Sequence, residues 1–207
     1  AVIPASSSRC FNSVSPALKR EIAGVVAAAG AAYVEIAVMA PVQPYGHTVP
    51  MLAGGPSAGR FVELMAPFGM RLEAVGGEVG TVAAVKMCRS IVVKGIEALL
   101  AECVLGASPY GAAGKVFASL QETWPGIDWK ELADYTMGRI VVHGERRARE
   151  MEEVAETLRA IGVEPIMASA TAQRQQWSAT LRLNEHFGAE GPATYQDVID
   201  VLQRSPD

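Results

Sequence analysis

Hydrophobic positions in the first part of the chain alternate between two patterns, one typical of helices and one typical of strands. A first helix is predicted over residues 15–30. Ser15 suits its amino cap, Pro16 its first turn and Gly30 its end, and the segment before Ser15 is expected to be extended. A second helix is predicted over residues 56–67 from its helical spacing of apolar side chains. Short apolar runs predict strands at residues 32–40, 48–53 and 71–75.

After Gly80 the strand signals disappear and helical spacing takes over. A long helix is predicted over residues 81–106, and a charged amphipathic helix over residues 144–161 ends at the sequence GVEP. Further helices are predicted at residues 110–122, 129–142, 170–186 and 194–203. The predicted organisation is therefore an α/β domain over residues 1–79 followed by an all-helical domain over residues 80–207.

The composition and charge of the chain indicate what kind of molecule it binds. Half of the 207 residues are hydrophobic, which suffices for a substantial core, and the formal charge is only -4. No basic patch suggests nucleic acid or an anionic membrane surface, so a small-molecule partner is expected. Charged residues interrupt the longest apolar run, which argues against a membrane span.

Cysteine and histidine usage indicates neither disulfides nor a metal site. The chain has three cysteines, Cys10, Cys88 and Cys103, in no CxxC spacing. Its three histidines are scattered and lie at no metal-ligand spacing. A reducing, cytoplasmic location and no bound metal are therefore expected.

Three segments carry a resemblance to a known family. They are GEVGTVAAVKMCRS at residues 77–90, GGPSAGRFVELMAPFG at residues 54–69 and FNSVSP at residues 11–16. In this order they resemble the 6-phosphogluconate and β-hydroxyacid dehydrogenase superfamily. Residues 146–165 (RRAREMEEVAETLRAIGVEP) look most like a poorly characterised branch with a 6-phosphogluconate dehydrogenase-like C-terminal domain. The resemblance implies the last part of a Rossmann-type sheet followed by an all-helical domain.

The resemblance assigns the proton-transfer role to Lys86. Hydride transfer from an alcohol requires removal of the hydroxyl proton, and a lysine can accept it if burial lowers its pKa. Without the resemblance, a lysine on an apolar helix is more simply a surface residue whose stem packs against its neighbours. Arg89 and Ser90 follow at helical spacing and are expected beside Lys86 on the substrate. The alternative for Arg89 is a solvated or salt-bridged guanidinium.

Other substrate and cofactor positions follow from the same resemblance. Asn12 and Ser13 match residues at the substrate and nicotinamide site, although turn and capping chemistry before Pro16 explains them equally well. Met39 and Ala40 stand where most β-hydroxyacid dehydrogenases carry a serine and a glycine that grip the substrate carboxylate. This departure makes a bulkier or less polar substrate conceivable.

A further match lies in the second half of the chain. Arg149 and Glu150 fall where many members have a lysine and an aspartate near the active site, and Arg149 is a candidate cofactor contact. The alternative is a solvated helix face with pairs between residues four apart.

The implied cofactor is NAD or NADP. Complete members begin with a strand, a GxGxxG turn and a helix that holds the pyrophosphate, and this chain contains no such sequence. Gly54 and Gly55 do not supply it, because the third glycine and the acidic residue beyond it are missing. The chain therefore resembles a fragment, and alone it is expected to bind a dinucleotide poorly.

The expected function is hydride transfer between NAD(P) and a small hydroxyl or carbonyl compound, by a homodimer formed through the helical domain. Two alternatives remain open. The first alternative is a catalytically silent helical dimerisation module that lacks the nucleotide-binding half. The second is a reductase that acts on imines. The substrate, the choice of cofactor and the direction of reaction are not encoded in any motif of this chain.

Overall fold

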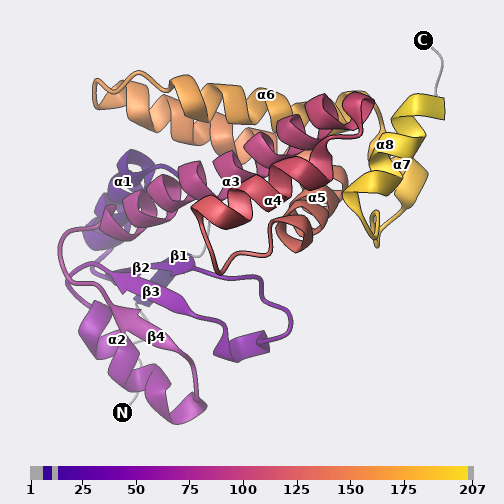
Figure 1. Ribbon diagram of the computed structural model, residues 1–207. Helices are drawn as coiled ribbons and strands as arrows, with labels where there is room; N and C mark the ends of the chain where they lie inside the picture. The colour runs from indigo at the N-terminus through magenta and orange to yellow at the C-terminus, as the bar shows by residue number, and fades with distance from the viewer. Residues whose placement is uncertain (1–6, 11–13, 205–207) are drawn as a thin grey trace. The chain divides into compact units, whose positions relative to one another are not determined.

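The protein forms two compact units, Ala1–Arg89 and Ser90–Asp207, in a computed structural model that describes residues 7–10 and 14–204. The division falls inside one long helix, α3 (Thr81–Ala107). Figure 1 labels the elements of both units. The functional boundary between residues 79 and 80 stays a prediction.

The first unit contains a four-stranded sheet in the order β1-β2-β3-β4. Its strands are β1 (Ser7–Cys10), β2 (Ala32–Val38), β3 (Met51–Gly54) and β4 (Leu72–Ala74). The outer pairs β1–β2 and β3–β4 are parallel, and the central pair β2–β3 is antiparallel. Helices α1 (Pro16–Ala28) and α2 (Ala58–Met65) make the two parallel crossovers.

Local sequence explains most of these elements. The Ser15 hydroxyl accepts a hydrogen bond from the Leu18 amide at 3.2 Å, and Pro16 opens α1, as predicted. The predicted strand over residues 48–53 is too long, because a short 3-10 turn, η1 (Gly46–Thr48), precedes β3. The core of this unit packs Phe61 of α2 against the apolar faces of the strands, including Ile36 and Ala53.

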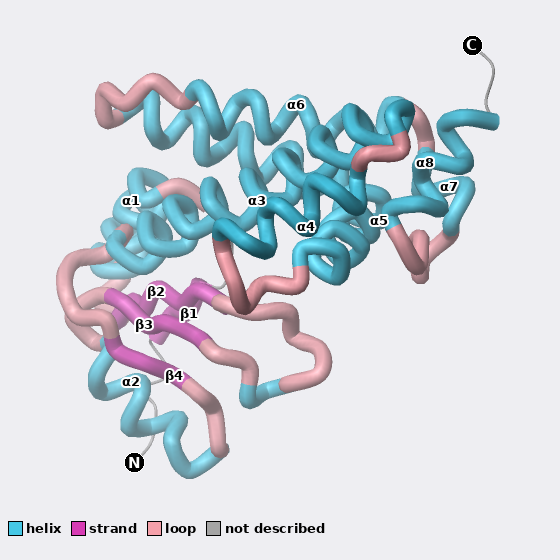
Figure 2. The backbone as a smooth tube through the Cα atoms, viewed as in Figure 1, coloured by secondary structure: helices cyan, strands magenta, loops and turns pink. Residues whose placement is uncertain are grey.

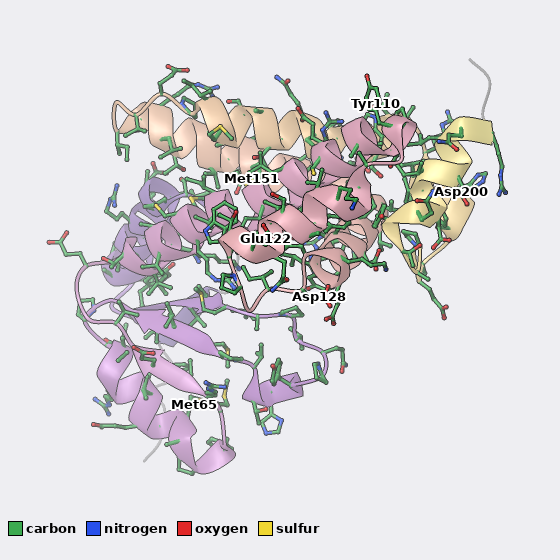
Figure 3. The ribbon with its side chains drawn as sticks, viewed as in Figure 1. Met65, Tyr110, Glu122, Asp128, Met151 and Asp200 are labelled. Carbon is green, nitrogen blue, oxygen red and sulfur yellow. The ribbon has the colours of Figure 1, made fainter. Side chains whose placement is uncertain are left out.

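The described residues of the second unit, 90–204, form helices joined by loops and contain no strand (Figure 2). Besides its share of α3 it contains α4 (Ala113–Thr123), α5 (Trp129–Ala160), α6 (Ile166–Thr180), α7 (Leu183–Phe187) and α8 (Tyr195–Arg204). Its core gathers Val104, Phe117, Met137 and Ile140. Met151 of α5, labelled in Figure 3, is completely buried. The predicted fold class, a partial Rossmann-type domain followed by an all-helical domain, is confirmed.

Two helix boundaries in this unit differ from the prediction. Residues 129–142 and 144–161 were expected to form separate helices, but they form the single helix α5. The expected helix over residues 170–186 begins earlier and is divided into α6 and α7. Among the described residues, no helix has both the length and the apolar character needed to cross a membrane.

Gly144 explains the first of these errors. It lies in the interior of α5, where a Cβ atom would approach the carbonyl oxygen of Gln175 on α6 to 2.5 Å. The glycine therefore does not end a helix but allows two helices to approach closely, and α5 and α6 pack side by side.

We predict that Gly144→Ala lowers the free energy of unfolding by about 1–3 kcal/mol, because the methyl group pushes against a helix backbone. The control is Gly106→Ala in α3, where no heavy atom lies within 4 Å of the added carbon. This control should be neutral or stabilising by up to about 1 kcal/mol through helix propensity. Urea denaturation measures both. Equal stability of the two variants would contradict the packing role of Gly144.

Candidate functional site

A buried carboxylate fixes the start of helix α3. Glu35 lies in the middle of β2 with none of its surface exposed. Its carboxylate accepts hydrogen bonds from the backbone amides of Gly80 at 2.7 Å and Ala83 at 2.6 Å. These amides belong to the first turn of α3, where unpaired N–H groups and the helix dipole favour a negative charge. Strand β2 therefore sets the position of the helix that carries Lys86.

Two glycines allow this close approach. A Cβ atom at Gly54 would lie 2.7 Å from Cγ2 of Val82, the second residue of α3. Gly80 has φ +103°, and a Cβ atom there would lie 3.1 Å from the Pro16 carbonyl oxygen. The first turn of α3 thus packs against β3 and the start of α1 at distances that only glycine permits.

Lys86 follows Ala83 by one helical turn and is half-buried. Arg89 is exposed and Ser90 is half-buried, three and four positions further along the same helix. This arrangement agrees with the spacing expected from the sequence. The chemical roles of the three residues stay predictions.

Met39 and Ala40 directly follow β2, and both are half-buried. The Met39 amide donates to the Pro50 carbonyl oxygen at 2.9 Å, and Ala40 packs against the core of the first unit. The position is therefore built from apolar side chains. Asn12 and Ser13 lie outside the described residues.

The helical unit contains a cluster of buried charges that sequence reasoning missed. Glu97 of α3 is 2% exposed and pairs with two arginines of α5. The guanidinium of Arg139 lies 3.3 Å from one carboxylate oxygen, and Arg147 pairs with the other. The amide of Gln175 on α6 donates to the same carboxylate at 3.1 Å. Helices α3, α5 and α6 therefore meet at one carboxylate.

A second ion pair lies beside this cluster. Lys94 Nζ is 2.8 Å from the Glu150 carboxylate, and only 7% of the lysine side chain is exposed. Burial lowers the pKa of Lys94, opposed by the hydrogen bond and charge of Glu150. Burial also raises the pKa of the Glu150 carboxyl, but the hydrogen bond and charge of Lys94 outweigh it, so that its pKa is lowered.

Arg149 points away from this buried pair. Its side chain is 73% exposed and pairs with Glu145, four residues earlier on the same helix. Arg146 pairs with Glu150 at 2.5 Å in the same way. The solvated pairs weighed as an alternative are thus present, and the cofactor contact of Arg149 stays a prediction.

Neither Gly54 and Gly55 nor the amino end of α3 fits the pyrophosphate of a dinucleotide. The carboxylate of Glu35 occupies the amino end of α3. Gly54 and Gly55 face Val82 and Val79, whose methyl groups fill the space that a phosphate would need. Among the described residues, no group of three or more histidine, cysteine or acidic side chains is arranged to hold a metal ion.

Comparisons with known proteins show what this chain is similar to. Residues 107–178 match the model of a domain of unknown function (DUF1932). A conserved hypothetical protein from Sinorhizobium meliloti 1021 has 37% sequence identity and a TM-score of 0.81, over 96% of this chain and 66% of that one. An uncharacterized 28.5 kDa protein of Methanothermus fervidus is 26% identical over 77% of this chain and 61% of its own length. The chain thus spans less than two thirds of both relatives.

Two further structures connect the chain to dehydrogenases. The conserved protein MTH1747 of unknown function, described as structurally similar to 3-hydroxyacid dehydrogenases, has 27% identity and a TM-score of 0.71 over 86% of this chain and 67% of that one. Residues 107–178 thus match DUF1932, and the chain is similar in sequence and fold to a protein described as resembling 3-hydroxyacid dehydrogenases. A 3-hydroxyisobutyrate dehydrogenase from Mycobacterium tuberculosis, at 16% identity, shares the fold, with a TM-score of 0.68 over 98% of this chain and 72% of that one. The resemblance to this superfamily is confirmed.

We predict that Glu35→Gln lowers the free energy of unfolding of the protein by about 1.5–3 kcal/mol, the usual contribution of a hydrogen bond to a charged group. Hydrogen exchange at the amides of Gly80 and Ala83 should also become faster. Glu73→Gln, at an exposed position on β4 of the same sheet, serves as the control and should change neither measurement. Unchanged exchange at Gly80 and Ala83 in the Glu35 variant would contradict the capping role.

We predict that Glu150→Gln costs about 1–3 kcal/mol of stability at pH 7 and progressively less as the pH falls. Because the pKa of Glu150 is lowered on folding, its contribution is present above its unfolded pKa of about 4.5 and is lost as the pH falls through the lower folded pKa. Denaturant titrations from pH 7 down to a pH below the folded pKa of Glu150 measure this difference.

The matched control is Glu145→Gln, which removes only an exposed pair with Arg149. Surface pairs of this kind contribute about 0–1 kcal/mol, so the control should be nearly neutral at every pH. A Glu150→Gln penalty that does not depend on pH would show that the carboxylate charge is not what stabilises the fold.

Proposed function

We propose that the complete protein is an NAD(P)-dependent dehydrogenase or reductase that transfers hydride between the nicotinamide and a small hydroxyl or carbonyl compound. The main support for this proposal is the position of Lys86. It is half-buried and lies one helical turn beyond the start of α3, which Glu35 caps. The likeness to 3-hydroxyacid dehydrogenase-like proteins supports the reaction class. This chain, which spans 66% and 61% of two relatives, supplies the proton-transfer side, and a further part of the complete protein holds the dinucleotide.

In this proposal Lys86 exchanges a proton with the substrate oxygen. As a neutral amine, Nζ accepts the hydroxyl proton during oxidation, and as an ammonium it donates that proton to the carbonyl oxygen during reduction. The hydrogen bonds from Glu35 fix the first turn of α3 relative to the sheet, and therefore the position of Lys86 one turn later. The rate of proton transfer depends on such fixed positioning of the acid–base group.

We propose that six further positions recognise the substrate, and that this site is less polar than in most family members. Ser90 and Arg89 extend from the Lys86 helix, and Arg89 has the charge to pair with a carboxylate or phosphate. Asn12 and Ser13 are proposed to complete the substrate side. Met39 and Ala40 offer no hydrogen bond through their side chains, which favours an apolar group at that position of the substrate.

We also propose that the protein is a homodimer in a reducing cytoplasm. Helix α3 exposes apolar side chains at successive helical spacings: 61% of Val92, 38% of Ile96 and 60% of Leu99. An apolar stripe of this kind is the expected surface for a two-fold helical interface.

The decisive experiment replaces Lys86 in the complete protein, including its nucleotide-binding half. Lys86→Met should lower kcat by about 10²–10⁴-fold, the range for loss of an acid–base group, while the Kd of NAD(P)H stays the same. Lys115→Met, at an exposed lysine of α4, is the control and should keep full activity. A near-normal rate in the Lys86 variant would refute the assignment.

The two rival functions give different outcomes in the same assays. A silent dimerisation module would dimerise but show no turnover with any hydroxyacid, aldehyde or imine in the complete protein. An imine reductase would reduce cyclic imines and leave hydroxyacids untouched, and the apolar pair Met39 and Ala40 is the observation that favours testing it.

A further inference from the structure

A groove lies in the helical unit between α5 and the loop that joins α7 to α8. Its volume is about 320 Å³, at the lower end of the range for small-molecule sites. Tyr135, Arg139 and His143 line one side, and Glu190 and Pro192 of the loop line the other. None of these residues is assigned to substrate or cofactor by the family resemblance.

The two walls of the groove are held at a fixed separation. A Cβ atom at Gly191 would lie 2.7 Å from Cγ2 of Val142, so the loop rests directly on α5. Helix α8 is tied to α5 as well, because the Tyr195 amide donates to the Asp134 carboxylate at 2.9 Å. The groove is therefore part of the folded unit and is formed before any ligand binds.

The charge beside the groove is not balanced. Glu97 is a single buried carboxylate that both Arg139 and Arg147 share, which leaves one positive charge in excess. Arg139 uses Nε for Glu97, and its Nη1 donates to the Tyr135 hydroxyl at 3.2 Å. Its guanidinium thus links the buried carboxylate to the groove, where a second anion would neutralise the excess.

The pKa of His143 is affected by the same excess of positive charge. Burial lowers the pKa of its imidazole, and the nearby guanidinium groups of Arg146, Arg139 and Arg147 lower it further. Glu150 is the one acidic group that opposes these effects among those that act on this imidazole. Burial and the positive surroundings therefore both disfavour the protonated form of the ring.

The two acidic residues of the groove, Asp134 and Glu190, repel an anion only weakly. Asp134 is already neutralised, because Lys130 Nζ lies 2.8 Å from its carboxylate and the Tyr195 amide binds its other oxygen. Glu190 belongs to the loop wall and is exposed, so water and salt screen its charge.

We propose that this groove binds a small anion, a carboxylate or a phosphate, between Arg139 and His143. The anion takes the remaining donors of the guanidinium and stabilises a proton on the imidazole, so that both side chains donate charge-assisted hydrogen bonds. The apolar surfaces of Val142 and Pro192 then accommodate the body of an organic anion.

The test is an NMR titration of the chain with inorganic phosphate and, separately, with succinate, at an ionic strength kept constant with sodium chloride. We expect a saturable shift of the His143 imidazole signals and a higher pKa of this ring in the bound state. The His143→Gln variant assigns those signals among the three histidines. Saturation with phosphate alone identifies a phosphate site, and saturation with succinate alone identifies a carboxylate site.

Three variants make the test specific. Arg139→Gln should weaken binding about tenfold or more, as loss of a charge-assisted hydrogen bond predicts. Arg146→Gln is the charge-matched control, because Arg146 pairs with Glu150 and does not line the groove, so the anion should still bind with only a modest loss of affinity.

The Arg139 variant also disturbs Glu97, so a second variant blocks the groove without touching the ion pairs. Gly138 lines the groove, and a Cβ atom there would lie 3.6 Å from the Pro192 carbonyl oxygen, an ordinary contact. Gly138→Leu should therefore fold and abolish binding. Absence of saturable binding by the unmodified chain, or equal binding by the Gly138→Leu and unmodified chains, would overturn the proposal.

Discussion

The position of α3 depends on a carboxylate that is completely removed from water. Glu35 exchanges its hydration for the amides at the start of the helix, and this exchange is favourable only because both oxygens find donors at hydrogen-bonding distance. The glycines at positions 54 and 80 are a consequence, since any side chain there would hold the helix away from its acceptor. Glu97 has a similar role in the helical unit, where one buried carboxylate holds α3, α5 and α6 together.

The sequence predicted the elements well wherever local rules determine them. The cap at Ser15, the proline after it and the apolar spacing of α3 were all sufficient. The break predicted near Gly144 was wrong, because a glycine can mark either the end of a helix or a close contact between two helices. Only the position of the neighbouring helix distinguishes the two cases. The division into α6 and α7 falls at Arg182, whose φ is +52°, and no proline or glycine marks it within residues 170–186.

The candidate site was predicted less completely than the fold. Lys86 was found because its neighbours form a family signature, but Glu35 and Glu97 were passed over within apolar runs. A charged residue inside such a run is the signal that could have found them, because a buried charge needs partners. The partners come from distant segments, Gly80 and Ala83 for Glu35 and Arg147 for Glu97, so spacing along the chain could not identify them.

Glu97 also restricts how homologues of this protein can diverge in sequence. Two guanidinium groups and one amide rely on the same acid, so losing it would strand two cations inside the protein at once. A single replacement at position 97 should therefore be rejected, and this position should change only together with compensating exchanges at positions 139 and 147. Across distant homologues these three positions should vary as a set, even where the surrounding helices have diverged.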